Sequence, residues 1–268
     1  MIFLNLCNGK DILNIEKAIP IPLEKLYDFP NHPFKVNDDK EMENMVETVK
    51  TGGIIMPLVV RQRNDGNYEI ISGHRRKMAS QKAGLKEVPC IIRDLSDDEA
   101  TIIMVDSNMQ RERILPSEKA FAYKMKLEAQ KHQGQRTDLT SSQVATKLNE
   151  ERTATKIGSE FGESKDTVYR YIRLTELIPE LLELVDKEKD GMAFSPAVEI
   201  SYLKEDEQYI LLNLIQFNDA TPSQTQAKYM KKLSQEGRLT TEKMEEIMGE
   251  QKPNQVEKIK IKADKIQK

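Results

Sequence analysis

Two consecutive arginines follow a Ser-Gly pair at the place where a β-rich run gives way to a helical pattern. The motif reads Ser72-Gly73-His74-Arg75-Arg76. The free backbone N–H groups at a helix start, together with the helix dipole, attract anions. Gly73 permits close approach of the backbone to a ligand, and an arginine grips phosphate oxygens with two parallel N–H donors. These residues indicate a phosphate site; the alternative is a pair of solvated or ion-paired arginines. The motif is not a Walker loop, because no Gly-Lys-Ser/Thr follows.

A second polar motif, Asp106 to Arg113, ends a predicted helix shortly before Pro116. Its Asn108 offers an amide oxygen, a ligand type that suits Mg²⁺, and its Arg111 offers donors to a phosphate. The alternative is an ordinary charged helix end, since such ends are common beside a helix dipole. Taken alone, this motif favours the ordinary helix end.

Residues 153–174 have the spacing of two short helices joined by a tight turn. Gly158 is small where two helices must approach, and Gly162 follows in a turn that needs a positive φ. Ser164 is a suitable N-cap for the second helix. Apolar residues recur at helical spacing on both sides of the turn. The segment therefore fits a helix-turn-helix at about 153–175, whose second helix enters the major groove of DNA.

The second helix of this motif has a polar, basic face that suits DNA. Lysine and arginine fit phosphates or guanine edges, and threonine and tyrosine fit phosphates or thymine. The expected DNA-binding residues are Ser164, Lys165, Thr167, Tyr169, Arg170 and Arg173. An ordinary helical hairpin with a few basic residues is the alternative, and the agreement of glycine spacing, cap and basic face favours DNA binding. Residues 111–136 also lean basic, which indicates either a solvated helix face or a flank of the duplex.

Hydrophobic periodicity and turn chemistry predict the elements that position these motifs. Ser96 and Glu99 form a capping box at the start of a helix. Asn64-Asp65-Gly66-Asn67 makes a hairpin turn between two β-rich runs. The predicted strands cover 19–22, 57–63, 68–72 and 88–93. The predicted helices cover 39–50, 74–83, 96–108, 116–132, 141–150, 153–161, 165–176, 178–187, 205–217, 222–234 and 240–248.

The change from a mixed to a purely helical pattern predicts an α+β fold. A small mixed α/β N-terminal domain is followed by an all-α helix-turn-helix domain. We place the first domain at residues 1–110 and the helical DNA-binding domain at 111–249. We interpret residues 250–268 as a basic tail, which is either the start of a dimerisation domain or a tail beside which dimerisation uses another surface. The segment 132–140 is the best candidate for a flexible joint.

Composition narrows the classes of function. Lys plus Arg total 41 and Asp plus Glu total 44, so the formal charge of −3 excludes a uniformly basic nucleic-acid coat but not a local basic patch. The two cysteines, Cys7 and Cys90, exclude a disulfide framework and a cysteine metal site. No apolar run approaches the length of about 18 residues that a membrane span needs. The N-terminal apolar run lacks the basic leader of a signal peptide. We therefore expect a cytoplasmic protein.

Taken together and in order, these motifs resemble the ParB family of chromosome and plasmid partition proteins. The sequence YEIISGHRRKMASQKAG resembles the family's glycine-x-arginine-arginine box. The sequence NMQRERILPSEKAFAY resembles a second box, in which the family has Glu-Asn-x-x-Arg before a Pro-x-Glu-x-Ala helix. The helix-turn-helix then follows at the expected distance. The resemblance runs from near Ile19 to about Leu203 and implies a ParB- and sulfiredoxin-like fold for the N-terminal domain.

Members of this family are dimeric, CTP-dependent DNA clamps, and the resemblance implies the same for this chain. They load on a palindromic centromere-like site of double-stranded DNA through the helix-turn-helix. CTP and Mg²⁺ bring two N-terminal domains together, and the closed clamp slides along DNA while a ParA-type ATPase moves the complex. The resemblance thus implies a homodimer on nucleoid or plasmid DNA, with no membrane partner. The implied nucleotide-binding residues are Ser72, Gly73, His74, Arg75, Arg76, Asn108 and Arg111, of which Asn108 also holds the metal.

Three positions depart from the family's pattern. Ser107 stands where the family has a glutamate that helps with the metal and with hydrolysis, so a slow CTPase activity is left open. His74 stands where many members have glutamate, which changes the contacts expected to cytosine or ribose. Phe34 or Lys35 stands at about the place of an arginine in the loop before the first helix.

Two other functions stay open on these residues. A ParB-like transcriptional regulator or nucleoid-binding protein would bind DNA without nucleotide switching, and Ser107 slightly favours it. A sulfiredoxin-like phosphotransferase or a nuclease would need a nucleophile or a carboxylate cluster. The first arginine motif contains no cysteine, and Cys90 lies on a predicted strand. The sequence therefore assigns no catalytic residue.

Overall fold

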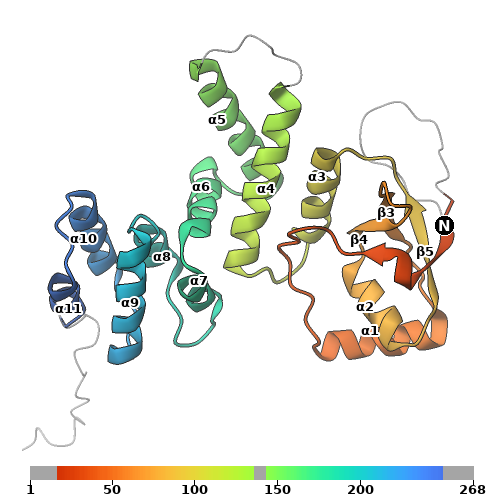
Figure 1. Cartoon of the computed structure of the whole chain (residues 1–268), viewed down its shortest axis with the longest axis horizontal. Helices are drawn as coiled ribbons and strands as arrows, with labels where there is room; N and C mark the ends of the chain where they lie inside the picture. The colour runs from red at the N-terminus through yellow and green to blue at the C-terminus, as the bar shows by residue number, and fades with distance from the viewer. Residues whose placement is uncertain (1–16, 136–142, 250–268) are drawn as a thin grey trace, which may run out of the picture. The chain divides into compact units, whose positions relative to one another are not determined.

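The structure, a computed structural model, describes residues 17–135 and 143–249 (Figure 1). Its contacts divide the chain into two compact units. The first unit holds the described residues up to Ile114 and Phe121–Lys165, and the second holds Leu115–Ala120 and the described residues from Asp166 onward. The predicted division at residue 110 concerns independently folding domains, which these contacts do not test, so it stays a prediction. The predicted tail at 250–268 and most of the predicted joint lie outside the described residues.

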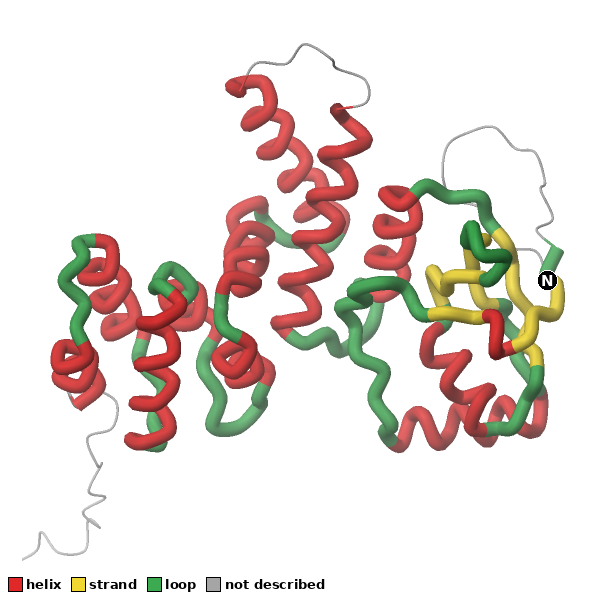
Figure 2. Tube along the Cα trace, viewed as in Figure 1, coloured by secondary structure: helices red, strands yellow, loops and turns green. Residues whose placement is uncertain are grey.

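A mixed sheet forms the base of the first unit, and the second unit is helical in its described part (Figure 2). The predicted hairpin is confirmed, with an antiparallel pairing of its two strands and a φ of +79° at Gly66. The predicted strand with two prolines lies at an edge, where missing N–H donors do no harm. In order across the sheet, the strands are β1 (Ile19–Pro22), β5 (Glu87–Ile92), β3 (Leu58–Gln62), β4 (Tyr68–Ser72) and β2 (Leu26–Tyr27).

Helices α1 (Lys40–Gly52), α2 (His74–Lys82) and α3 (Asp97–Asn108) complete the α/β part of the first unit. The side chain of Asp39 caps α1 by accepting a hydrogen bond from the Met42 N–H at 2.9 Å. The predicted capping box of Ser96 and Glu99 is confirmed at the start of α3. Helices α1 and α2 pack through Met42, Val46, Val49 and Ala79. The capping box fixes where α3 begins, and the helix then ends within the second polar motif.

Two long helices, α4 (Pro116–Gln135) and α5 (Gln143–Glu160), follow α3. The prediction of separate helices at 141–150 and 153–161 is wrong, since α5 is continuous through 151 and 152. The segment between the predicted helices contains no glycine or proline, so nothing there breaks the backbone pattern. The first turn of α4 belongs to the second unit.

The second unit is built from helices around one apolar core. Leu174, Leu181, Ile200, Leu211 and Met230 are among its buried side chains. The sequence pattern does not predict α8, whose third residue is a proline. The helix nevertheless forms, because the first turn of a helix tolerates proline. The helices are α6 (Lys165–Arg173), α7 (Pro179–Asp186), α8 (Phe194–Ile200), α9 (Glu205–Asn218), α10 (Gln224–Gln235) and α11 (Thr241–Gly249), with a 3-10 turn at Leu174–Glu176.

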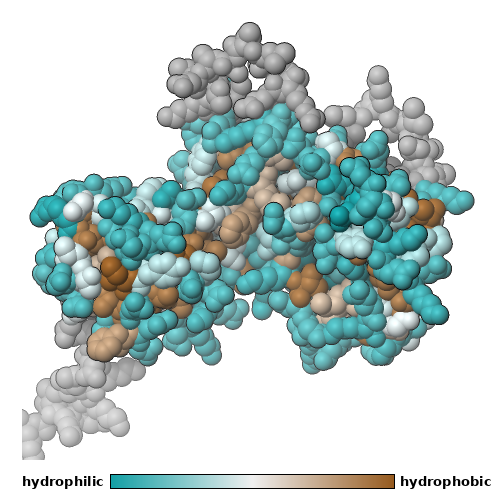
Figure 3. Space-filling view, in the orientation of Figure 1, coloured by the Kyte–Doolittle hydropathy of each residue, from teal (hydrophilic) through white to brown (hydrophobic). Residues whose placement is uncertain are grey.

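Hydrophilic residues cover most of the face shown in Figure 3, and apolar residues show mainly between elements. Among the described residues, no helix is long and apolar enough to cross a membrane. The order of the elements, a mixed α/β unit followed by helices, is the fold class that the sequence predicts.

Candidate nucleotide site and nucleic-acid interface

The first polar motif forms a turn between β4, which ends at Ser72, and the start of α2. Gly73 is the N-cap of α2 and adopts a φ of +116°, which disfavours any residue with a side chain. A Cβ atom at this position would lie 2.8 Å from Cγ of Leu58. The N–H groups of the first helical turn have no partners within a helix. The turn thus presents a bare backbone and free donors to a ligand.

Arg76 lies half-buried behind this turn. Its Nη1 atom donates to the carbonyl oxygens of Met56 at 2.7 Å and Pro57 at 2.6 Å, just before β3. Burial lowers the pKa of Arg76, yet an arginine stays protonated at neutral pH. Within the part of the chain described, no carboxylate forms an ion pair with it. Its charge is therefore available to an anion at the start of α2.

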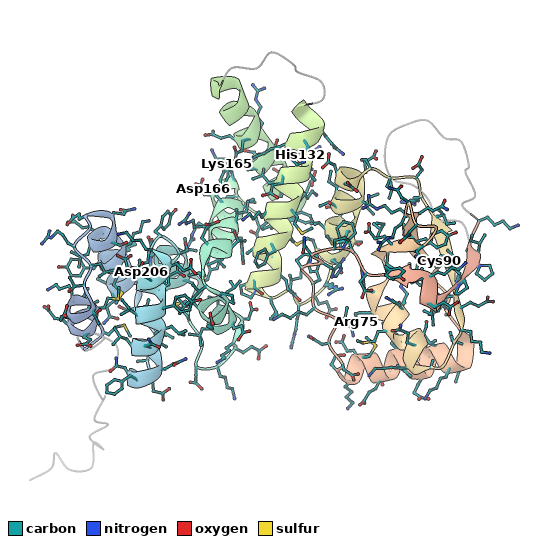
Figure 4. All side chains as sticks on the ribbon, in the orientation of Figure 1. Arg75, Cys90, His132, Lys165, Asp166 and Asp206 are labelled. Carbon is teal, nitrogen blue, oxygen red and sulfur yellow. The ribbon has the colours of Figure 1, made fainter. Side chains whose placement is uncertain are left out.

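Arg75 has a different environment. Its Nη2 atom lies 3.3 Å from a carboxylate oxygen of Asp39 and 3.2 Å from one of Glu41. Figure 4 shows Arg75 beside the start of α1, which carries these two acids. The Nε atom of Arg75 is buried and has no hydrogen-bond partner. Arg75 is thus an ion-paired arginine, as the alternative interpretation of the motif expects. A phosphate would have to compete with two carboxylates for its guanidinium.

The loop before α1 joins the two polar motifs. The Phe29 N–H donates to Nε2 of His74 at 3.4 Å, and the rings of His32 and His74 lie 4.0 Å apart. On the other side of the loop, the Arg111 guanidinium lies 5.4 Å from the centroid of the Phe34 ring. The structure therefore brings His74 and Arg111 to one loop, as the resemblance requires. Both residues that stand at about the place of the family's arginine, Phe34 and Lys35, contact Arg111.

We expect His74 to make the first unit sensitive to acid. Burial, followed by the charge of His32, lowers the pKa of His74 from 6.5 to about 3. Between these pH values the unfolded chain binds a proton that the folded chain does not, so the free energy of unfolding falls as pH falls. Between pH 6.5 and 5 the loss is about 2 kcal/mol. Urea unfolding at both pH values should show a larger loss in the wild type than in His74→Gln, in which His32, whose pKa burial also lowers, still contributes. An equal loss in the two proteins would contradict the assignment.

Asn108 lies at the end of α3 with only 6% of its surface exposed. Its amide nitrogen donates to the Met104 carbonyl at 2.8 Å, which leaves the amide oxygen as the acceptor that a cation needs. Ser107 donates its hydroxyl to the same carbonyl at 3.0 Å. Asp106 pairs with Lys126 of α4. The carboxylate nearest in sequence is thus engaged elsewhere, and neither Asp106 nor Ser107 replaces the family's glutamate.

Sequence reasoning missed the role of Lys126, which counted only as part of a basic stretch. Its side chain is 2% exposed and forms ion pairs with Asp106 of α3 and Glu160 of α5. Its ammonium also lies 4.7 Å from the centroid of the Phe161 ring. Its burial could have been predicted from its position, because it lies one helical turn after Ala122 and Tyr123, which are buried on α4. A buried ammonium with two carboxylates therefore ties α3, α4 and α5 together.

The turn after α5 has the geometry that its glycines predict. A Cβ atom at Gly158 would lie 2.5 Å from the carbonyl oxygen of Glu163, so no larger residue fits there without a shift. Gly162 adopts a φ of +70°. The capping role of Ser164 stays a prediction. Helix α5, this turn and α6 therefore follow one another as a helix-turn-helix requires.

The predicted DNA-binding residues differ in their exposure and in their contacts. Thr167 and Tyr169 are half-buried, Ser164 and Arg170 are exposed, and Figure 4 shows Lys165 at the start of α6. Arg170 also donates to the Ser195 hydroxyl at 2.8 Å, a contact that an exposed side chain can exchange. Arg173 instead donates to the Ser201 carbonyl at 2.6 Å. Arg173 is thus half-buried against the residue that ends α8.

Residues 10–109 match the family model of the ParB N-terminal domain. The chain carries a ParB N-terminal domain. The match spans the sheet, α2 and α3, and so includes both polar motifs up to Asn108. The mixed α/β unit is therefore the fold that the resemblance predicts.

Named relatives extend the likeness beyond the ParB N-terminal domain. A nucleoid occlusion protein of Geobacillus sp. is 39% identical over 137 residues, which are 50% of this chain and 49% of that protein. The chromosome-partitioning protein Spo0J of Thermus thermophilus is 31% identical over 170 residues, which are 63% of this chain and 55% of that protein. The chain thus spans about half the length of the curated relatives it matches.

Crystal structures of C-terminally truncated ParB from Caulobacter crescentus are also similar. The complex with the centromeric parS site has 24% identity and a TM-score of 0.44, and covers 86% of this chain and 98% of that chain. The complex with CTP-gamma-S has 25% identity and a TM-score of 0.33, and covers 72% of this chain and 96% of that chain. At these low TM-scores, no residue role follows from either structure.

Proposed function

We propose that the chain is a site-specific DNA-binding partition protein that binds CTP and Mg²⁺ and slides on DNA as a clamp during plasmid or chromosome segregation. The observation that carries this proposal is the arginine turn at Gly73 and Arg76 inside a ParB N-terminal domain. A helix-turn-helix follows it in the same chain. The names of the relatives, chromosome-partitioning and nucleoid occlusion proteins, agree with a role on chromosomal DNA.

The residues present fit a triphosphate. The N–H groups at the start of α2 and the Arg76 guanidinium lie close together at Gly73, where a Cβ atom would come within 3.2 Å of Nη2 of Arg76. Arg111 contacts the same loop that His74 contacts, and it adds a second cation. Phosphate oxygens are the ligands that such donors and charges bind best. The choice of CTP over other nucleotides rests on the resemblance to the ParB family.

The metal has less support from the chain than the phosphates have. Mg²⁺ in nucleotide sites is held by one or two carboxylates together with phosphate oxygens and waters. Asn108 supplies one amide oxygen, Ser107 supplies no charge, and Asp106 is paired with Lys126. A bound Mg²⁺ would therefore rely mainly on phosphates and water. For the same reason we expect CTP hydrolysis to be slow.

Calorimetric titration of CTP in Mg²⁺ buffer tests the proposal. ATP, GTP and UTP serve as controls, and each titration is repeated with and without a palindromic duplex. We expect CTP alone to bind, and to bind more tightly with the duplex. Failure of all four nucleotides to bind would overturn the clamp function.

A nucleoid-binding regulator that needs no nucleotide is the second candidate. The ion pairs of Arg75 with Asp39 and Glu41, and the serine at position 107, favour it. This function predicts duplex binding that is identical with and without CTP. A homodimer and a ParA-type ATPase partner belong to the partition function and follow only from the resemblance.

A further inference from the structure

Two cations lie against one aromatic ring in the second unit. The guanidinium carbon of Arg173 is 4.2 Å from the centroid of the Tyr202 ring, and Nζ of Lys231 is 3.6 Å from the same centroid. Tyr202 is 40% exposed. The ring therefore joins the end of α6 to α10 through cation–π contacts. Positive charge continues from the predicted recognition helix onto a helix that no sequence motif marks.

Helix α10 carries a basic face beyond this ring. Lys228, Lys231, Lys232 and Gln235 repeat at three- and four-residue spacing, so they share one side of the helix. Together with Glu199 of α8 they line a hollow of about 340 Å³. Lys231 is paired with Glu199 at 2.8 Å, and Nζ of Lys232 lies 4.0 Å from a carboxylate oxygen of Glu236. Lys228 and Lys232 are both exposed. Three lysines thus face one carboxylate in this hollow.

We infer that Arg173, Lys228, Lys231 and Lys232, here named the cationic strip, bind the phosphate backbone of DNA beside the groove that α6 enters. The inference rests on the proposed DNA-binding function and extends its contact surface to α8 and α10. The strip adds affinity and orientation, and base reading stays with α6.

The chemistry of the strip suits phosphates better than bases. Lysine is a compact charge without the planar fork that reads guanine, and phosphate contacts position a protein without reading sequence. Arg173 is held by the Ser201 carbonyl and hydroxyl, so its orientation is already fixed before DNA arrives. The basic face from 228 to 235 is about 10 Å long, which matches the axial rise of about three phosphates on one strand. An acidic protein surface is the competing partner, and it would need no continuity with α6.

Salt-dependent binding of the whole chain to a duplex of mixed sequence tests the strip. The double variant Lys228→Gln/Lys232→Gln removes two exposed charges and should fold normally. We expect the slope of log K against log salt concentration to become shallower by about 2, since each lost phosphate contact contributes about 0.9. The fall in affinity should be the same on a mixed-sequence and on a palindromic duplex, whereas Arg170→Ala should weaken only the preferred sequence.

Two matched controls separate this effect from net charge and from misfolding. The variant Lys187→Gln/Lys189→Gln removes the same charge from the exposed loop after α7 and should keep the wild-type slope. The variant Lys228→Arg/Lys232→Arg keeps the charge and should keep the affinity. If the wild type binds no duplex, the proposed function fails. If the wild type binds and the glutamine variant keeps its slope, the strip alone is refuted and an acidic protein becomes its partner.

Discussion

Replacing Arg76 with alanine is expected to weaken CTP binding by about 100-fold while duplex binding through α6 persists. Two charge-assisted hydrogen bonds to phosphate contribute roughly 3 kcal/mol, and each 1.4 kcal/mol is a factor of about ten in affinity. Arg76 has no carboxylate partner among the described residues, so this charge is free to act on the ligand. Calorimetry with CTP and a parallel duplex-binding assay would measure both effects.

Arg75 is the matched control for Arg76. It is the same residue type one position earlier on α2, but its charge is already shared with Asp39 and Glu41. We expect Arg75→Ala to weaken CTP binding by less than Arg76→Ala does. Arg76 also holds the carbonyls of Met56 and Pro57, so thermal unfolding of Arg76→Lys checks whether loss of binding reflects loss of fold. Normal CTP binding by a folded Arg76→Ala protein would show that the nucleotide site lies elsewhere.

Local chemistry predicted most of the scaffold because its signals are short-range. The hairpin turn, the capping box at Ser96 and the glycine pair at 158 and 162 each act within a few residues, and the structure has all three. The missed elements lack such signals. Strand β2 has two residues, and α8 carries Pro196 in its first turn, where proline is harmless. The false break in α5 came from expecting two short helices before the turn.

The positions of the site motifs were predictable, but the partners of their charged side chains were not. Sequence spacing places Arg75 and Arg76 side by side, yet one meets two carboxylates from α1 and the other meets two carbonyls before β3. The same limit applies to Arg173, which periodicity assigns to the DNA-facing side and whose contacts with Ser201 and Tyr202 the periodicity does not predict. These contacts join residues that are 19 to 36 positions apart, so no local pattern encodes them.

Removing both acids that face Lys126 is expected to cost about 3–5 kcal/mol of unfolding free energy, because the change leaves a buried ammonium without a counter-charge. The test is the double variant Asp106→Asn/Glu160→Gln. Lys126 is 2% exposed, whereas Asp106 and Glu160 are 42% and 36% exposed. The reverse change, Lys126→Met, removes the buried charge and leaves two acids that water can reach. It should therefore cost less than the double variant. Urea unfolding of both proteins compares the two values.

The ion pairs of Lys126 with Asp106 and Glu160 also make the end of α3 a poor metal site. Asp106 is held by Lys126 and lies two residues before Asn108 on another face of α3, so it can reach a ligand of Asn108 only if it is released and the helix end shifts. In Lys126→Met this carboxylate is released. If Asp106 can then serve the metal, CTP binding should gain a stronger dependence on Mg²⁺ concentration than in the wild type. A greater loss of stability in Lys126→Met than in the double variant would contradict the buried-charge argument. An unchanged Mg²⁺ dependence would mean that phosphates and Asn108 hold the metal without help from Asp106.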